Sequence, residues 1–196
     1  MKGPHATVLY EDQMLKGQSG FPLHDLVMRL VEDDINGEFW RFNGLVAGLP
    51  RKGIDKIIED LPRTGRLAGP GKLMVLVDSD RIAEHLKLPP TAAHDLIITT
   101  MRDRSDQPDK LQVFFLRPNL EGLLRAIQTC DPTLLPNNLT RALAKKLIDR
   151  DLVFIEVKKA KYRDLRGCVR GAQPGFHALA QAIAASIPAV TRGDLR

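Results

Sequence analysis

The sequence predicts an α/β protein with a Rossmann-like, mostly parallel sheet that is covered by helices on both faces. Short apolar runs of strand length alternate along the chain with segments in which apolar residues recur every three or four positions. The 196 residues are 43% hydrophobic, which is enough to build one core. The longest apolar runs, "MVLV" and "LVFIEV", fall short of the roughly 20 residues that cross a bilayer. We therefore expect no membrane association.

The first half of the chain contains three units in which a strand is followed by a helix. The expected strands are "ATVLYE" (residues 6–11), "GEFWRFNGLVAG" (37–48) and "KLMVLV" (72–77), and the expected helices are 21–34, 52–61 and 81–88. Pro89 and Pro90 end the third helix because proline cannot continue one. Phe39, Trp40 and Phe42 lie on the second strand and are interpreted as core or edge residues.

The second half of the chain adds three strands and three helices. The expected strands are "DLIITTM" (95–101), "LQVFFL" (111–116) and "DLVFIEVKK" (151–159), and the expected helices are 119–130, 137–150 and 175–186. Asn119 is a suitable cap for the first of these helices, and Pro188 ends the last. The alternation of strands and helices along the chain predicts one compact α/β domain.

The amino-terminal segment and the two cysteines indicate the compartment. "MKGPHATVLYEDQ" reaches acidic residues before a signal-peptide core could form, which predicts a cytoplasmic protein. Cys130 and Cys168 are 38 residues apart and belong to no CxxC pair. This spacing favours two reduced, mostly buried thiols over a disulfide framework or a zinc site.

The positive charge is concentrated near the carboxyl terminus. Residues 1–140 contain 17 Lys and Arg against 19 Asp and Glu, whereas residues 141–196 contain 12 against 5. The densest stretch is "VKKAKYRDLRGCVR", which contains Lys158, Lys159, Lys161, Arg163, Arg166 and Arg170. Such a segment can hold a phosphate backbone without reading bases. An ordinary solvated basic face is the alternative interpretation.

Carboxylates follow three of the expected strands, at the point where each strand passes to a helix. Glu11 and Asp12 end the first strand, Asp78 and Asp80 end the third, and Glu121 lies just after the fifth. In a parallel sheet the carboxyl ends of the strands share one edge, where ligands bind. Two like charges about 4 Å apart repel by about 4 kcal/mol at an effective dielectric near 20, and a divalent cation relieves that repulsion. Carboxylate ligands favour Mg²⁺ or Mn²⁺ over zinc.

Each acid also has a purely structural explanation. Asp78 could cap the helix that begins near Arg81, and Glu121 lies near a helix amino terminus, where the macrodipole favours negative charge. Only the joint placement of the acids after strand ends points to a metal.

Four stretches resemble, in order and spacing, the Toprim (topoisomerase-primase) domain. They are "TVLYEDQ", "GLPRKGIDKIIEDL", "MVLVDSD" and "VFFLRPNLEGLL", and the closer likeness is to overcoming-lysogenization-defect nucleases and small stand-alone Toprim-like proteins. The resemblance implies a metal-binding core of Glu11, Asp78 and Asp80, with Glu121 as an additional ligand. Asp12 stands where the family usually has glycine, and it is either an extra ligand or a residue that crowds the site.

The resemblance covers roughly residues 6–130 and suggests how the chain is organised. We expect a Toprim-like metal-binding domain over residues 1–130 and a basic α+β extension over 131–196 that packs on it as a helix, a strand and a helix. Arg51 and Lys52, before the second helix, could contact a phosphate. Family members often work with a partner ATPase and in defence against phage, while the sequence leaves the oligomeric state open.

The expected reaction is hydrolysis of nucleic-acid phosphodiesters with Mg²⁺ or Mn²⁺. Asp78 and Asp80 would hold the metal, and Glu11 would bind metal or act as a general acid or base. The sequence contains no HExxH, GxSxG, GxGxxG or GxxxxGK[ST] motif. Three alternatives remain: a catalytically silent Toprim-like module that docks a partner, a glycosyltransferase that uses the DxD, and a haloacid-dehalogenase-type phosphatase, in which the key Asp would follow an earlier strand.

Overall fold

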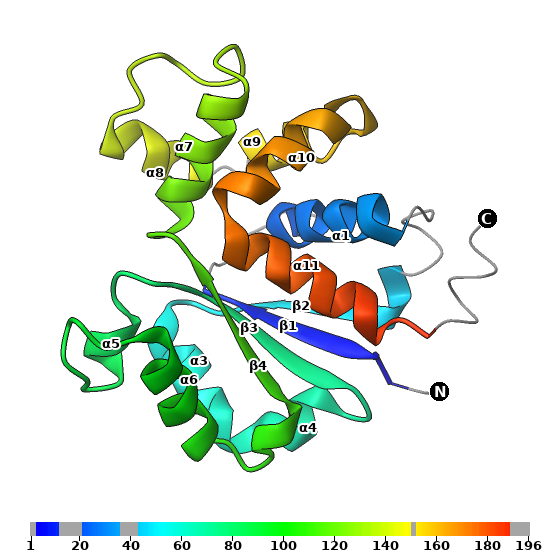
Figure 1. Ribbon diagram of the computed structural model, residues 1–196, viewed down its shortest axis with the longest axis vertical. Helices are drawn as coiled ribbons and strands as arrows, with labels where there is room; N and C mark the ends of the chain where they lie inside the picture. Colours follow the sequence, from blue (N-terminus) through cyan, green and yellow to red (C-terminus); the bar gives the residue numbers. More distant parts are fainter. Residues whose placement is uncertain (1–2, 12–20, 36–42, 150–151, 189–196) are drawn as a thin grey trace.

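Four parallel strands form the centre of the fold. The computed structural model describes residues 3–11, 21–35, 43–149 and 152–188 (Figure 1). The strands are β1 (Ala6–Tyr10), β2 (Val46–Pro50), β3 (Lys72–Asp78) and β4 (Leu111–Leu116), in the order β2-β1-β3-β4. Tyr10 lies opposite Pro50 on one side and Leu76 on the other, and Asp78 lies opposite Leu116. The parallel α/β class predicted from the sequence is confirmed.

Helices cover both faces of this sheet (Figure 1). One face carries α1 (Pro22–Ile35), α7 (Leu120–Cys130), α8 (Arg141–Asp149), α9 (Leu152–Val157), α10 (Arg163–Ala172) and α11 (Pro174–Ser186). The other face carries α3 (Ile54–Asp60), α4 (Thr64–Ala68), α5 (Ile82–His85) and α6 (His94–Asp103). Short 3₁₀ turns span Asn43–Leu45, Leu61–Arg63, Pro108–Lys110 and Ala160–Tyr162.

The alternation of side chains along the strands produces two separate cores. Met74 and Leu76 of β3 pack with α1, α7 and α11, whereas Val75 and Val77 pack with α3, α5 and α6. Both sets are almost fully buried, as a parallel sheet with two covered faces requires. Helix α11 lies against α1 and across β4, so the carboxy-terminal helices share the core of the sheet (Figure 1).

Two of the six strands expected from the sequence are helices instead. Residues 95–101 belong to α6, where Ile97 and Met101 are buried one helical turn apart. Residues 152–157 form α9, in which Val153 and Val157 are buried and Ile155 is exposed. Burial in both segments therefore follows the helical period. The part of the carboxy-terminal extension that the structure describes is helical, and the predicted α+β character is wrong.

The second strand begins later than the sequence suggested. The expected strand covered residues 37–48, whereas β2 spans Val46–Pro50 and follows a 3₁₀ turn at Asn43–Leu45. Phe39, Trp40 and Phe42 lie outside the described residues. In the described parts of the chain, no helix combines the length and apolar character needed to span a membrane.

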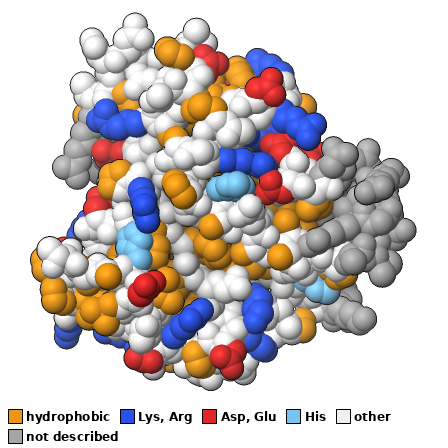
Figure 2. All heavy atoms as spheres, viewed as in Figure 1, with side chains coloured by type: hydrophobic (Ala, Val, Ile, Leu, Met, Phe, Trp, Pro, Cys, Tyr) orange, Lys and Arg blue, Asp and Glu red, His pale blue; other side chains and the backbone are white. Residues whose placement is uncertain are grey.

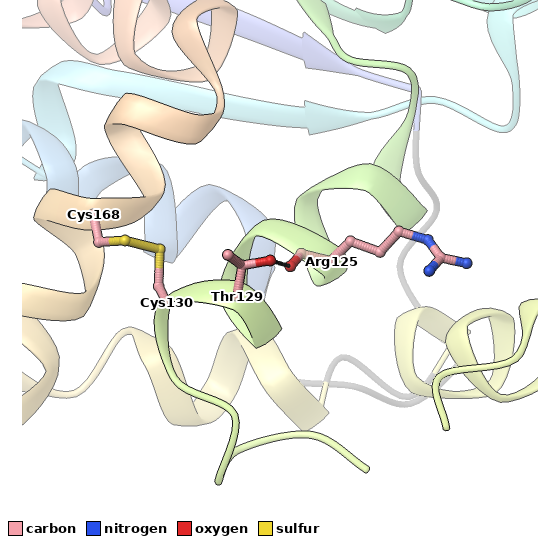
Figure 3. The surroundings of a disulfide bond; sticks show 4 residues. All are labelled: Arg125, Thr129, Cys130 and Cys168. Carbon is pink, nitrogen blue, oxygen red and sulfur yellow. Dashed lines mark hydrogen bonds between the residues drawn. A yellow bond between two sulfur atoms is a disulfide. The ribbon is translucent and has the colours of Figure 1, made fainter. Parts of the chain in front are cut away.

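A disulfide bond joins Cys130 to Cys168, so the expectation of two reduced thiols is wrong. The two Cα atoms are 5.9 Å apart, and the bond links the end of α7 to the middle of α10 (Figure 3). Cys130 is half-buried and Cys168 is exposed, so the expected burial is also incorrect. The spacing of 38 residues carries no information about this pairing, because the packing of α10 on α7 creates it.

Candidate active site

The carboxyl ends of β1 and β3 bring Glu11 and the DxD stretch together. Glu11 follows β1 directly, and Asp78 is the last residue of the neighbouring strand β3. Glu11 Oε2 accepts a hydrogen bond of 3.1 Å from the backbone N–H of Asp78. The backbone N–H of Glu11 in turn donates to the carbonyl of Leu76 at 3.4 Å. These two acids therefore share one edge of the sheet, as the parallel arrangement predicted.

Asp80 is exposed and is held by the turn that follows β4. Asn119 Nδ2 donates to Asp80 Oδ2 at 2.8 Å, while Asn119 Oδ1 accepts from the backbone N–H of Gly122 at 3.1 Å. The sequence predicted the second bond, which caps α7. It did not predict the first, because the neighbouring positions of β3 and β4 create that contact. Asn119 is thus a site residue that sequence reasoning identified only as a cap.

The carboxylates do not converge on a single point. Among the described residues, no group of three or more His, Cys, Asp or Glu side chains is placed so that it could hold a metal ion. Strand alternation explains this. Asp78 has the same parity as Leu76, which packs with α1 and α7, whereas Glu11 has the parity of Leu9, which packs with α3 and α5. Glu11 consequently reaches the backbone of Asp78 and not its carboxylate.

Two further candidate ligands were expected at this edge. Glu121 lies in the first turn of α7, two residues beyond Asn119, and is half-buried. Asp12 lies outside the described residues. Glu121 therefore follows β4, which is the neighbour of β3 in the sheet.

The surroundings of Glu11 change its acidity. Burial raises the pKa of its carboxyl group above the usual value, and the negative charge of Asp80 raises it further. The backbone N–H of Asp78 and electrostatic interactions with His85 and Arg81 act in the opposite direction. Burial prevails, so Glu11 keeps its proton to a higher pH than an exposed glutamate. A carboxyl group in this condition is suited to binding a cation or transferring a proton.

A histidine near this acid is paired with an aspartate of another helix, and no local sequence pattern predicted that pairing. His85 Nδ1 and Asp55 Oδ1 are 2.7 Å apart, which joins α5 to α3. The His85 side chain is 20% exposed and that of Asp55 is 72% exposed. His85 ends α5 (Ile82–His85), the short helix that follows the DxD, and it lies close enough to Glu11 to act on the pKa of that carboxyl group.

Arg51 and Lys52 lie at the carboxyl end of β2, where a phosphate contact was expected. The backbone N–H of Arg51 donates to the carbonyl of Tyr10 at 2.8 Å, which places it beside β1. Its side chain is already engaged, because Nε donates to Asp60 Oδ2 at 2.5 Å and Nη1 donates to the Pro50 carbonyl at 3.2 Å. Lys52 is exposed. Lys52 is therefore the more accessible of the two cations.

The basic segment near the carboxyl terminus is paired with acids of other helices. Lys158 Nζ lies 2.6 Å from Asp25 of α1, and both Lys159 and Lys161 contact Glu156 of α9. Figure 2 shows basic and acidic side chains interspersed over the face that includes α10 and α1. These contacts neutralise much of the charge that the sequence concentrates there.

The burial of Arg166 argues against the nucleic-acid contact that was expected for this residue. The residue is 2% exposed, and Nε and Nη2 donate to the two carboxylate oxygens of Asp33 at 2.8 and 3.0 Å. Nη1 donates to the carbonyls of Val157 and Lys159 at 3.1 and 2.8 Å. Arg166 thus joins α10 to α1 inside the fold and cannot contact nucleic acid. Arg163, on the same helix, stays exposed and lies 3.7 Å from Asp33.

The sequence matches no protein-family model and no curated protein. Among solved structures, the chain aligns with the C-terminal region of the OLD protein of Xanthomonas campestris pv. campestris. The alignment covers 98% of this chain and 94% of that one, with 16% sequence identity and a TM-score of 0.41. At this level of similarity, function has to be argued from the residues of the site itself.

Proposed function

We propose that this protein is a Toprim-like nuclease that hydrolyses nucleic-acid phosphodiesters with Mg²⁺ or Mn²⁺. The observation that carries the proposal is that Glu11 and Asp78 lie at the carboxyl ends of two neighbouring parallel strands and are joined by a hydrogen bond, with Asp80 two residues beyond Asp78. The pKa of Glu11, which burial raises and the charge of Asp80 raises further, supports it because a bound cation would stabilise the charged form of this carboxylate.

The donor set fits a hard divalent cation. Glu11, Asp78 and Asp80 offer carboxylate oxygens, which Mg²⁺ and Mn²⁺ prefer, and Glu121 and Asp12 are further candidates. Such an ion supplies Lewis-acid polarisation of a phosphodiester and a more acidic bound water. The described residues offer no ready group of three ligands. Binding by all three acids therefore requires the Glu11 side chain to exchange the Asp78 N–H for the ion.

The remaining residues have separate roles in this proposal. Asn119 holds one oxygen of Asp80 and so limits the orientations of that carboxylate. Glu11, with its raised pKa, can hold or release a proton closer to neutral pH than an exposed glutamate. Lys52 is an exposed cation at the same edge and can contact a phosphate. Exposed Lys159, Lys161 and Arg163 would add weaker, salt-sensitive contacts to the backbone.

Cleavage assays test the proposal directly. We expect the purified protein to cut DNA or RNA with Mg²⁺ or Mn²⁺ and not with EDTA, and we expect Asp78→Asn and Glu11→Gln each to lower the rate at least about 100-fold. Asp103→Asn is a matched control, because Asp103 is an exposed acid at the far end of α6. Equal cleavage in EDTA, or by the Asp78 and Glu11 variants, would show that these acids do not carry the activity.

A catalytically silent module is the second candidate, favoured by the absence of a three-ligand group in the described part of the chain. In that case the fold would dock nucleic acid or a partner protein, for example an ATPase involved in phage defence. Thermal melting separates the two proposals. A nuclease of this type should gain stability at millimolar Mg²⁺, and Asp80→Asn should abolish the gain. A silent module should melt at the same temperature with and without metal.

A further inference from the structure

We propose that Gln173 is a positioning residue that sets the DxD segment of the candidate site from the carboxy-terminal helices. The functional part of this inference rests on the nuclease proposal, whereas the structural part does not. Gln173 lies between α10 and α11, more than 90 residues from the DxD along the chain. Its connection to Asp80 runs through one three-residue turn.

Gln173 binds the end of β4 as a neighbouring strand would. Its Oε1 accepts a 3.1 Å hydrogen bond from the backbone N–H of Arg117, and its Nε2 donates to the Arg117 carbonyl at 2.7 Å. The residue is only 3% exposed. The Gln173 side-chain oxygen and nitrogen are thus both satisfied by the backbone of Arg117, and these two hydrogen bonds fix the position of Arg117.

The turn held by Gln173 in turn holds the DxD segment. The Pro118 carbonyl accepts from the backbone N–H of Ser79 at 2.8 Å and from that of Asp80 at 3.3 Å, and Ser79 Oγ donates to it at 3.2 Å. Asn119 then donates to the Asp80 carboxylate. Residues 117–119 therefore bind Gln173 through Arg117, and they bind the backbone and the carboxylate of Asp80 through Pro118 and Asn119.

The position of Gln173 is itself strongly constrained. Its backbone N–H donates to the carbonyl of Val169, and its carbonyl accepts from the N–H of His177, so the residue joins the two helices. Two residues later, a Cβ at Gly175 would lie 2.0 Å from the carbonyl oxygen of Phe115. Glycine is needed there because the start of α11 lies directly on β4. The amide consequently has one place to bind, next to Arg117.

The use of a buried amide side chain at position 173 indicates that Gln173 positions the turn and does not serve packing alone. A buried residue that served packing alone would be apolar, because an amide has to be fully satisfied to avoid a penalty. Here the amide is directed at the turn whose next two residues bind the DxD segment. Loss of this contact frees the Pro118 carbonyl and Asn119 to move, and Asp80 with them.

Amide exchange measured by NMR tests the structural part without metal. Gln173→Met keeps the length of the side chain and removes both hydrogen bonds, so we expect the Ser79 and Asp80 amides to exchange about tenfold faster or more. Gln181→Met is the matched control, because Gln181 is exposed on α11. Unchanged exchange at Ser79 and Asp80 in a folded Gln173→Met protein would overturn the inference.

Metal titration of the same variants tests the functional part. We expect Gln173→Met and Asn119→Ala each to weaken Mn²⁺ binding about tenfold, and we expect the double variant that carries both substitutions to bind little more weakly than either. Gln173→Glu, which keeps the acceptor for the Arg117 N–H, should fall between wild type and Gln173→Met in both measurements, and it serves if the Met variant does not fold. Weaker binding in the control as well would overturn a specific role for Gln173. If wild type binds no Mn²⁺, the nuclease proposal fails and amide exchange alone decides the positioning role.

Discussion

The buried histidine on α1 is expected to make the fold sensitive to mild acid. His24 is 8% exposed, and its Nδ1 shares a 2.8 Å hydrogen bond with the hydroxyl of Tyr10. The ring stacks on Phe21 and lies so close to β2 that a Cβ on Gly48 would be 2.4 Å from it. Burial lowers the pKa of His24 to about 4, against an opposing effect of Asp25.

The size of the effect follows from linkage between protonation and folding. The unfolded chain binds a proton at His24 near pH 6.5, whereas the folded protein does so only near pH 4. Stability from this group is therefore fully present above pH 6.5 and is lost as the pH falls toward 4. At about 1.4 kcal/mol for each pKa unit, the loss is about 3 kcal/mol in the free energy of unfolding.

Urea unfolding at several pH values measures this loss. We compare wild type with His24→Asn, which keeps a polar atom near the Tyr10 hydroxyl but cannot take up a proton. His24→Asn should be less stable at pH 7.5 and should lose about 3 kcal/mol less than wild type between pH 7 and 4. His177→Asn on α11 serves as a control and should keep the wild-type dependence. An identical pH dependence in wild type and His24→Asn would refute the reasoning.

Two further predictions concern the attachment of α10. Reduction of the Cys130–Cys168 bond should lower the free energy of unfolding by about 4 kcal/mol, because the unfolded chain regains the freedom of a loop of about 38 residues. Urea unfolding with and without dithiothreitol measures this loss, and an unchanged unfolding midpoint would contradict the prediction. Arg166→Met should cost about 3 to 5 kcal/mol, because Asp33 keeps a charge without its main partner, and a second substitution, Asp33→Leu, should recover most of that loss in the same assay.

The sequence was sufficient for those elements whose local pattern agrees with their final surroundings. The strands at 6–11, 72–77 and 111–116 are continuous apolar runs next to helical segments, and the structure contains β1, β3 and β4 there. The stretch "DLIITTM" misled the assignment because its β-branched residues favour a strand, whereas α6 buries only Ile97 and Met101 on one side. Short apolar runs fit either periodicity, and tertiary packing decides between them.

The candidate site was predictable only as far as the sheet determines it. Parallel strands explain why Glu11 and Asp78 meet, and the sequence predicted that meeting. Whether Glu11 and Asp78 point to the same face depends on the register between β1 and β3, which the sequence does not reveal, so their divergence was not predicted. The partners of Lys158 and Arg166 lie on α1, more than 100 residues earlier. No local pattern could have identified Asp25 and Asp33 as those partners.

The placement of α11 against α1 bears on how the nascent chain acquires its structure. Helix α1 is complete once residue 35 has been made, yet the surface it packs against includes α11, which ends at Ser186. During synthesis, the apolar side of the sheet that carries α1 therefore stays uncovered until α11 has been made, some 140 residues later. The layer that contains α1 and α11 can therefore be completed only after the chain has been made through α11.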